Sequence, residues 1–285
     1  MMKNVAPAPF GEAKQFSLTD AEYRKLAGFI KQNYGINLKE EKRALLAGRL
    51  QNLLLVSGMQ SFTDYYNYLV SDRSGTAEVD LINRITTNHT FFMRESDHFE
   101  YFQKNVLPIL EKSVSNRDLR IWCAACSTGE ESYTLAMLID EYFGIKKVGW
   151  DSKVLATDIS EKALIDAKRG VYDAERVAPL PPHWRMNYFT PFQENTYRVA
   201  DRIKNEVIYR KFNLMDKHFP FKKKFHSIFC RNAMIYFDDE TKYDLVDKFY
   251  ACTEQGGYLF IGHSETLDKS RTGYRYVMPS VYVKE

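Results

Sequence analysis

The spacing of apolar residues changes once along this chain, near residue 115. From Ser17 to about Val114, apolar side chains recur every three or four residues, which is the period of amphipathic helices. Helices are expected over residues 17–35, 38–56, 61–70, 77–85 and 96–112, with Ser96 as a candidate N-cap of the last. Residues 1–15 lack this period. The pattern therefore predicts a flexible arm, 1–15, followed by an all-helical N-terminal subdomain, 16–94.

Beyond residue 115, short apolar runs alternate with amphipathic segments. Strands are expected over 119–125, 153–157, 207–212 and 226–230, and helices over 132–143, 161–169 and 240–251. Such alternation is typical of a parallel sheet covered by helices. Two further runs, 257–261 and 276–283, are spaced for antiparallel pairing, and the proline-containing stretch 171–206 predicts a small antiparallel insertion. The expected fold is α/β: a Rossmann-like sheet domain, 95–285, that carries this insertion.

Composition narrows the class of protein. The chain has 285 residues, of which 45% are hydrophobic, and a net charge of +3 from 40 basic and 37 acidic residues. A charge this balanced does not indicate a nucleic-acid binder. No apolar run approaches the ~18 residues of a membrane span, and the first residues lack the apolar core of a signal peptide. We therefore expect a cytoplasmic protein without membrane insertion.

Two of the four cysteines are spaced as C-x-x-C, Cys123 and Cys126. This spacing also occurs in redox and zinc sites. Cys123 lies inside an apolar run, however, and Cys230 and Cys252 stand apart from any paired histidine. We interpret all four as core thiols and expect no metal.

The stretch IWCAACSTGEESY joins the first expected strand to a helix. A dinucleotide-binding turn carries three glycines that let the backbone approach a pyrophosphate, whereas this turn has only Gly129. Glu130 and Glu131 would repel a phosphate and would attract a cationic amine. S-adenosylmethionine has such an amine, and we expect Glu130 to bind it. Both acids could instead serve only the positive end of the helix.

Polar residues also follow the next strands. Asp158 ends the second strand, where an acid in nucleoside-binding folds accepts the ribose hydroxyls, although it could instead cap the next helix. Asn213 follows the third strand and could reach an adenine edge. Asn232 and Tyr236 follow the fourth, where transfer chemistry would occur, or form a satisfied polar pair. Together with an antiparallel final strand, these residues favour an S-adenosylmethionine methyltransferase.

Five ordered motifs resemble the signatures of CheR-type chemotaxis receptor methyltransferases: TTNHTFFMRE, CSTGEE, ATDIS, FCRNAMIYFD and GHSE. The resemblance implies methyl transfer from S-adenosylmethionine to glutamate side chains on the cytoplasmic helices of chemoreceptors, with S-adenosylhomocysteine as product. We expect a monomer. The resemblance also implies that eight residues contact the cofactor: Asn88, Thr90, Arg94, Glu130, Asp158, Asn213, Leu214 and Asn232. Arg94 and Tyr236 would lie nearest the transferred methyl and the incoming carboxylate.

The chemistry suits so sparse a site. A glutamate has a reference pKa of about 4.3, so the nucleophile is already ionised and needs no general base. Positioning and electrostatics would supply most of the acceleration. Arg94 could steer the substrate and cofactor carboxylates, but one arginine is not expected to clamp both. We interpret His263 as a structural residue or a lining of the adenine side.

Two features bear on the substrate. Lys39, Lys42, Arg43 and Arg49 fall within one arc of the second expected helix and could steer an acidic receptor helix, or form a solvated edge. Some relatives grip a receptor pentapeptide with a glycine-containing loop, yet no glycine stands between Gly170 and Gly256 here. We therefore expect independence from the pentapeptide. A nucleic-acid methyltransferase and a non-catalytic cofactor-binding module remain the alternatives.

Overall fold

The computed structural model describes residues 16–86 and 88–285, so the predicted arm, 1–15, lies outside the described residues. Contacts divide the chain into two compact units. Of the described residues, one unit comprises 16–29 together with Leu38–Ile85, and the other comprises Ile30–Asn37 and Thr86–Glu285. The larger unit thus includes the segment that carries Asn88, Thr90 and Arg94, whereas the predicted domain limits at 94 and 95 remain a proposal.

The smaller unit is helical, as the sequence predicts. Its elements are α1 (Asp20–Tyr34), whose end belongs to the larger unit, η1 (Glu40–Lys42), α2 (Arg43–Val56), α3 (Phe62–Ser71) and α4 (Thr76–Ile85). A capping box begins α1, because Glu22 accepts a hydrogen bond from Thr19 N at 3.0 Å and Glu22 N donates to Thr19 Oγ1 at 3.3 Å. The second predicted helix is shorter than expected and follows a separate 3₁₀ turn, η1.

The larger unit is built on a seven-stranded sheet. Its strands, in order across the sheet, are β6 (Val207–Lys211), β2 (Val154–Asp158), β1 (Ile121–Ala124), β7 (Phe225–Cys230), β8 (Thr253–Ile261), β10 (Val281–Lys284) and β9 (Tyr274–Met278). The first five are parallel, and β10 is antiparallel to both of its neighbours. The predicted Rossmann-like sheet is confirmed. The single strand predicted over 276–283 is wrong: Ser280 turns the chain at a φ of 61°, so that two strands form a hairpin.

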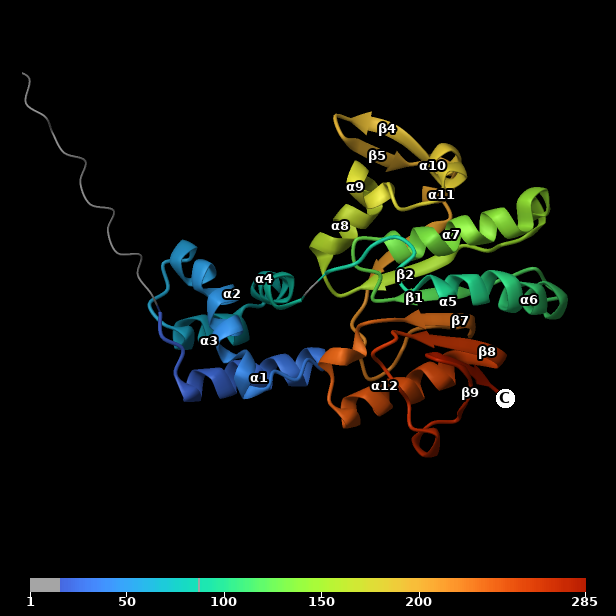
Figure 1. Ribbon diagram of the computed structural model, residues 1–285. Coiled ribbons are helices and arrows are strands. Elements are labelled where there is room, and N and C mark those ends of the chain that lie inside the picture. Colours follow the sequence, from blue (N-terminus) through green and yellow to red (C-terminus); the bar gives the residue numbers. More distant parts are fainter. Residues whose placement is uncertain (1–15, 87) are drawn as a thin grey trace, which may run out of the picture. The chain divides into compact units, whose positions relative to one another are not determined.

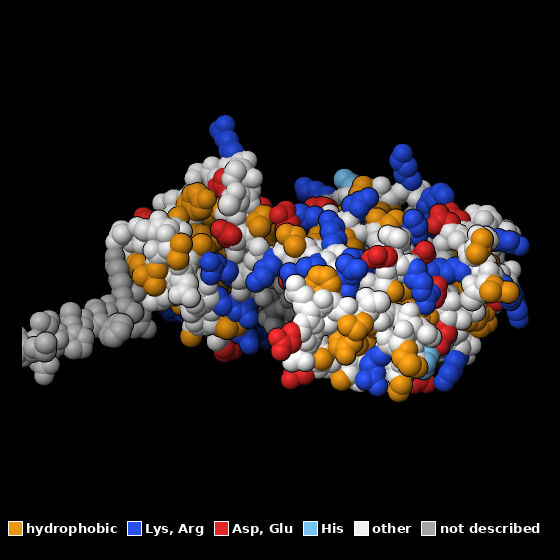
Figure 2. Space-filling view, turned by 90° about the horizontal axis from the view of Figure 1, so that it is seen from above, with side chains coloured by type: hydrophobic (Ala, Val, Ile, Leu, Met, Phe, Trp, Pro, Cys, Tyr) orange, Lys and Arg blue, Asp and Glu red, His pale blue; other side chains and the backbone are white. Residues whose placement is uncertain are grey.

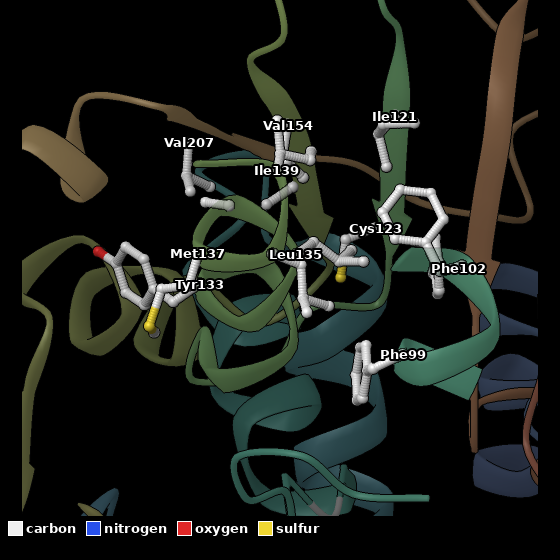
Figure 3. Packing of buried hydrophobic residues seen from close by; sticks show 14 of the residues in the cluster. Phe99, Phe102, Ile121, Cys123, Tyr133, Leu135, Met137, Ile139, Val154 and Val207 are labelled. Carbon is white, nitrogen blue, oxygen red and sulfur yellow. The ribbon is translucent and has the colours of Figure 1, made fainter. Parts of the chain in front are cut away.

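Helices cover both faces of this sheet (Figure 1). On one face lie α5 (Ser96–Tyr101), the π-helical η2 (Phe102–Val106), α6 (Leu107–Ser113), α7 (Glu130–Phe143) and α8 (Glu161–Arg169), and on the other α12 (Asp239–Cys252). Figure 3 shows Ile139 of α7 beside Val154 of β2, and Leu135 of α7 near Cys123 of β1. Because both faces are covered, β1 is buried throughout, which explains its continuous apolar sequence. Short 3₁₀ turns complete the unit: η3 (Gly144–Gly149), η4 (Met234–Tyr236) and η5 (Lys269–Arg271).

The helix predicted to be capped by Ser96 begins at Ser96 itself. Glu95 takes the cap position in the left-handed conformation, with a φ of 55° and no capping hydrogen bond from its side chain. The Glu95 carboxylate instead binds Arg231 and Asn232, which lie far away in the sequence. A long-range interaction therefore decides the start of α5.

The predicted antiparallel insertion is present. It contains a three-stranded sheet in the order β3 (Val171–Asp173), β5 (Thr196–Val199) and β4 (Phe189–Gln193). Three short helices that the sequence did not suggest accompany it: α9 (Ala174–Val177), α10 (Pro182–Tyr188) and α11 (Asp201–Lys204). Tyr172, Trp184 and Phe189 join the same apolar core as α7, so the insertion is packed onto the main sheet unit.

The surface of the larger unit carries charges of both signs (Figure 2). In Figure 2, Lys and Arg side chains on the larger unit are interspersed with acidic and apolar ones. Within the described residues, no helix is both long and apolar enough to span a membrane.

Candidate functional site

The turn between β1 and α7 is shaped by its backbone. Ala125, Ser127 and Gly129 all have positive φ, at 83°, 49° and 99°. The N–H groups of Ala125 and Cys126 donate to Thr157 O at 2.8 and 2.9 Å, which ties the turn to the end of β2. A Cβ on Gly129 would lie 2.9 Å from the Tyr209 hydroxyl. The one glycine is therefore required for conformation and packing, and it does not make this a phosphate cradle.

Asp158 links the end of β2 to the turn that follows β1. Its Oδ2 accepts from Ser127 N at 2.7 Å and its Oδ1 accepts from Ser160 N at 2.9 Å. Burial raises the pKa of this carboxyl, and the backbone N–H donors oppose that shift. Ser160 caps α8, because its Oγ accepts from Ala163 N at 3.2 Å. The capping alternative for Asp158 is thereby removed, and its predicted contact with the ribose stays a prediction.

The two glutamates after Gly129 have different partners. Glu130 is fully buried, and its carboxylate accepts from Thr128 Oγ1 at 2.7 Å and from Arg176 Nη2. Burial raises the pKa of Glu130 against the effect of these donors. Glu131 accepts from Arg231 Nη1 at 2.6 Å and from Cys123 Sγ at 3.2 Å. Each acid thus has a specific partner, which a general role at the helix end would not require.

The segment preceding α5 is fastened to this turn by its backbone. Asn88 O accepts from Ser127 Oγ at 3.1 Å, and Thr90 O accepts from Arg176 Nη2 at 3.3 Å. Arg94 O accepts from Arg231 Nη2, while the Arg94 side chain donates from Nη1 to His89 O at 3.0 Å. Asn88 is thus bonded to the turn directly, whereas Thr90 and Arg94 are linked to the turn and the start of α7 through Arg176 and Arg231.

A cavity of about 430 Å³ lies along this segment. Its lining residues come from two stretches of the larger unit: Asn88, His89, Thr90, Phe91, Phe92, Glu175, Arg176 and Pro179. The predicted site residues Asn88 and Thr90 thus share a cavity with a cation from the insertion.

Arg231 is a site residue that sequence reasoning missed. Its side chain is only 1% exposed, and it donates to Glu95 Oε2 at 3.0 Å as well as to Glu131. Its guanidinium also lies 4.9 Å from the centre of the Phe99 ring. The available signal was an arginine placed directly after a continuous apolar strand, where an unpaired charge would be costly.

The loop after β7 is held by a second missed residue, Glu265 of the GHSE motif. Its carboxylate accepts from the N–H groups of Asn232 at 3.0 Å, Ile235 at 3.1 Å and Gly262. Asn232 has a φ of 58° and donates from Nδ2 to Glu95 Oε1 at 3.1 Å. Asn232 is therefore oriented at the carboxyl end of β7, beside the segment that carries Arg94.

Three more of the predicted site residues have contacts of their own: Asn213, Leu214 and Tyr236. The Asn213 side chain donates to Asn33 O at 2.8 Å and accepts from Met215 N at 3.0 Å, so its amide already stabilises the chain after β6. Leu214 packs against the core under α12. Tyr236 ends η4 and is 39% exposed, and within residues 16–86 and 88–285 its hydroxyl makes no hydrogen bond. That hydroxyl is therefore available to a ligand.

Among the described residues, one group could supply three metal ligands: Glu95, His98 and His263, whose ligand atoms lie within 4.8 Å of one another. Glu95 is already paired with the guanidinium of Arg231, and that positive charge opposes a cation at the same carboxylate. Burial lowers the pKa of His98 to about 4, so this histidine is neutral. His263 Nε2 lies 3.1 Å from Asp97 Oδ2.

The predicted basic stripe lies in the smaller unit. Lys39 and Lys42 are exposed. Arg43 donates to Leu18 O at 3.1 Å and to Asp20, and Arg49 donates to Ile85 O, so both arginines hold the helical unit together. The helical spacing assumed for the stripe applies only from Arg43 onward, where α2 begins. Its role in substrate binding stays a prediction.

Comparison with known proteins extends these observations. Residues 88–283 match the family described as CheR methyltransferase, SAM binding domain, and residues 21–86 match the CheR methyltransferase all-alpha domain. A chemotaxis protein methyltransferase of Borreliella burgdorferi is 41% identical over 271 residues, covering 94% of this chain and 95% of the relative. Chemotaxis protein methyltransferase 1 of Pseudomonas aeruginosa is 34% identical, with coverages of 93% and 97%. The chemotaxis protein methyltransferase of Escherichia coli is 35% identical, with coverages of 89% and 87%.

Among solved structures, a glycopeptide N-methyltransferase, MtfA, complexed with S-adenosylmethionine aligns over 56% of this chain and 53% of its own. The identity is 12% and the TM-score 0.30. A likeness this weak has no bearing on the site.

Proposed function

Because the chain belongs to the CheR methyltransferase family of S-adenosylmethionine-dependent chemotaxis methyltransferases, we propose that it esterifies glutamate side chains of chemoreceptors. The products would be glutamate methyl esters and S-adenosylhomocysteine. The resemblance predicted from the five motifs is confirmed by these matches.

One observation supports the proposed position of the cofactor. Two buried carboxylates, Glu130 and Asp158, are both bonded to the short turn after β1, through Thr128 and Ser127 respectively. A buried acid accepts a cationic amine or a pair of hydroxyls, and the cofactor offers both groups. The residues present therefore fit its methionyl and ribose parts, with Asn88, Thr90, Arg94, Asn213, Leu214 and Asn232 as the further proposed contacts.

The cofactor supplies a methyl group on a positively charged sulfur. The chain's residues have to orient an acceptor carboxylate in line with that methyl. Arg94 is only partly exposed and lies on the segment that is bonded to the turn. It is therefore well placed to attract the incoming carboxylate. Tyr236 presents an exposed hydroxyl that can donate to the carboxylate. No residue needs to remove a proton, because the glutamate is ionised at neutral pH.

The acceptor is proposed to be the helical cytoplasmic part of a chemoreceptor. The matched relatives are named chemotaxis protein methyltransferases, which favours a protein acceptor over the nucleic-acid alternative. Their methyltransferase names also count against a non-catalytic module. Lys39 and Lys42, exposed near the start of α2, would attract acidic residues of the receptor.

The insertion, 171–206, contains no glycine, and none occurs before Gly256. We therefore propose that binding of the receptor does not depend on its C-terminal pentapeptide. Calorimetry against receptor C-terminal pentapeptides should give no measurable heat of binding at micromolar concentrations. Micromolar affinity would contradict the proposal.

Mass spectrometry of a coexpressed receptor tests the activity. The wild type should add one methyl mass to particular glutamate peptides, and mild alkali should release this label as methanol because it is an ester. Arg94→Ala should lose most of the label. Label on RNA that resists alkali would instead support a nucleic-acid methyltransferase.

A further inference from the structure

Arg176 lies at the centre of contacts that join three segments of the larger unit. From α9 in the insertion, its Nη2 donates to Glu130 Oε1, to Thr128 Oγ1 at 3.2 Å and to Thr90 O at 3.3 Å. Its guanidinium also lies 5.4 Å from the centre of the Tyr172 ring. The insertion therefore places a positive charge directly beside the buried acid expected to bind the cofactor.

The guanidinium retains unused donors. All of its hydrogen bonds to described residues come from Nη2, so Nη1 and Nε have no partner among residues 16–86 and 88–285. The side chain is 36% exposed and lines the cavity of about 430 Å³ next to Asn88 and Thr90. A ligand can therefore reach the free edge of Arg176 without breaking the contacts that hold it.

The methionyl end of the cofactor has two opposite charges on one carbon, an ammonium and a carboxylate. Glu130 and Arg176 carry the two charges that complement this ammonium and this carboxylate. The acid is fully buried and the base is partly exposed. An arginine can bind a carboxylate through two parallel hydrogen bonds. The pair is thus complementary to this end of the cofactor.

Arg94, a second arginine near the cavity, is arranged for a different task. Arg94 donates from Nη1 to His89 O at 3.0 Å, and its Nε lies 4.0 Å from Glu95 Oε1. A single guanidinium cannot clamp the carboxylates of cofactor and substrate at the same time. Two arginines, on separate segments, allow each carboxylate its own partner.

We propose that Arg176 binds the cofactor's carboxylate while Glu130 accepts its ammonium, so that the guanidinium of Arg94, beside the cofactor, can bind the acceptor glutamate. This inference rests on the proposed function, because it takes Glu130 as the ammonium site. It assigns the insertion a part in cofactor binding that is independent of any receptor peptide.

Calorimetry with the full chain and two ligands tests this assignment. One ligand is S-adenosylhomocysteine, and the other is its decarboxylated analogue, which keeps the amine, thioether and adenosine. The wild type should bind the analogue about tenfold to a hundredfold more weakly, as expected for one charge-assisted contact. Arg176→Met should bind the two ligands with similar affinity, because the carboxylate of S-adenosylhomocysteine no longer has a partner.

Further variants separate a binding role from a structural one. Equal weakening of both ligands by Arg176→Met, or unchanged or tighter binding of S-adenosylhomocysteine, would overturn the inference. Arg176→Lys keeps the charge beside Glu130 if the neutral variant fails to fold, and it should weaken only the carboxylate-bearing ligand. Arg185→Ala, an exposed arginine in α10 of the same insertion, is the control and should alter neither affinity. A wild type that binds neither ligand would contradict the proposed function itself.

Discussion

Arg231, directly after β7, donates from Nη2 to Glu95 Oε2 at 3.0 Å across a sequence separation of 136 residues. The same guanidinium donates from Nη1 to Glu131 Oε2 at 2.6 Å. One buried cation therefore joins the end of a central strand to the start of α5 and to the first turn of α7. Asn232 follows this strand, Arg94 precedes α5, and Glu130 begins α7.

Arg231→Met should destabilise the folded protein by about 3–5 kcal/mol, because it leaves two largely buried carboxylates without their cation. The free energy of unfolding, measured by urea denaturation, checks this. Arg185→Ala, which removes an exposed arginine, should change it by less than about 0.5 kcal/mol. A similarly small change for Arg231→Met would contradict a structural role for the pair.

Glu130 and Glu131 are adjacent in sequence and should behave differently on neutralisation. Glu130→Gln should weaken S-adenosylhomocysteine binding by about tenfold to a hundredfold, since the amine loses a charged acceptor. Glu131→Gln should mainly lower the free energy of unfolding, by about 1–3 kcal/mol, since it weakens the buried pair with Arg231. Calorimetry and urea denaturation of both variants provide the comparison. Equal effects of the two substitutions on affinity would contradict the division of roles.

The pKa of His98 should make stability depend on pH. Burial lowers it from an ordinary value of 6.5 to about 4, so between these pH values the unfolded chain binds a proton that the folded chain does not. Stability therefore falls as the pH is lowered through this window, and this one group should cost about 2 kcal/mol between pH 7 and pH 5. In His98→Gln the decrease in unfolding free energy over the same interval should be smaller by about that amount. An unchanged pH dependence would contradict the buried neutral histidine.

Gly262 leaves room for the loop that carries Asn232. A Cβ at this position would lie 2.8 Å from Asn232 N, closer than such contacts normally occur. Gly262→Ala should therefore displace Asn232 and weaken S-adenosylhomocysteine binding severalfold, as calorimetry would show. Gly48→Ala is the matched control, because Gly48 lies within α2 with nothing within 4 Å of the added carbon. That substitution should leave affinity unchanged and raise the free energy of unfolding by about 0.5–1 kcal/mol.

Local patterns in the sequence determined the order and type of most elements. The three-to-four-residue spacing in the first third predicts its helices, and the covered apolar runs predict the parallel strands β1, β2, β6 and β7. Glu161–Arg169 forms the predicted helix with the predicted limits. These features depend on residues a few positions apart and on the burial of one face of each element. They can therefore be recognised from the sequence alone.

Only the tertiary structure decided which charges pair. Glu130 binds Arg176, 46 residues away, and Glu131 binds Arg231, 100 residues away. Neither arginine was selected from the sequence. Arg231 directly follows an apolar strand, but no local pattern identifies its acidic partner, and nothing local distinguishes Arg176 from a surface arginine. Asn213 similarly bonds to Asn33 at the end of α1. Such pairings depend on the crossover order of the strands, since parallel sheets bring distant chain segments to one edge, where each buried charge requires a partner.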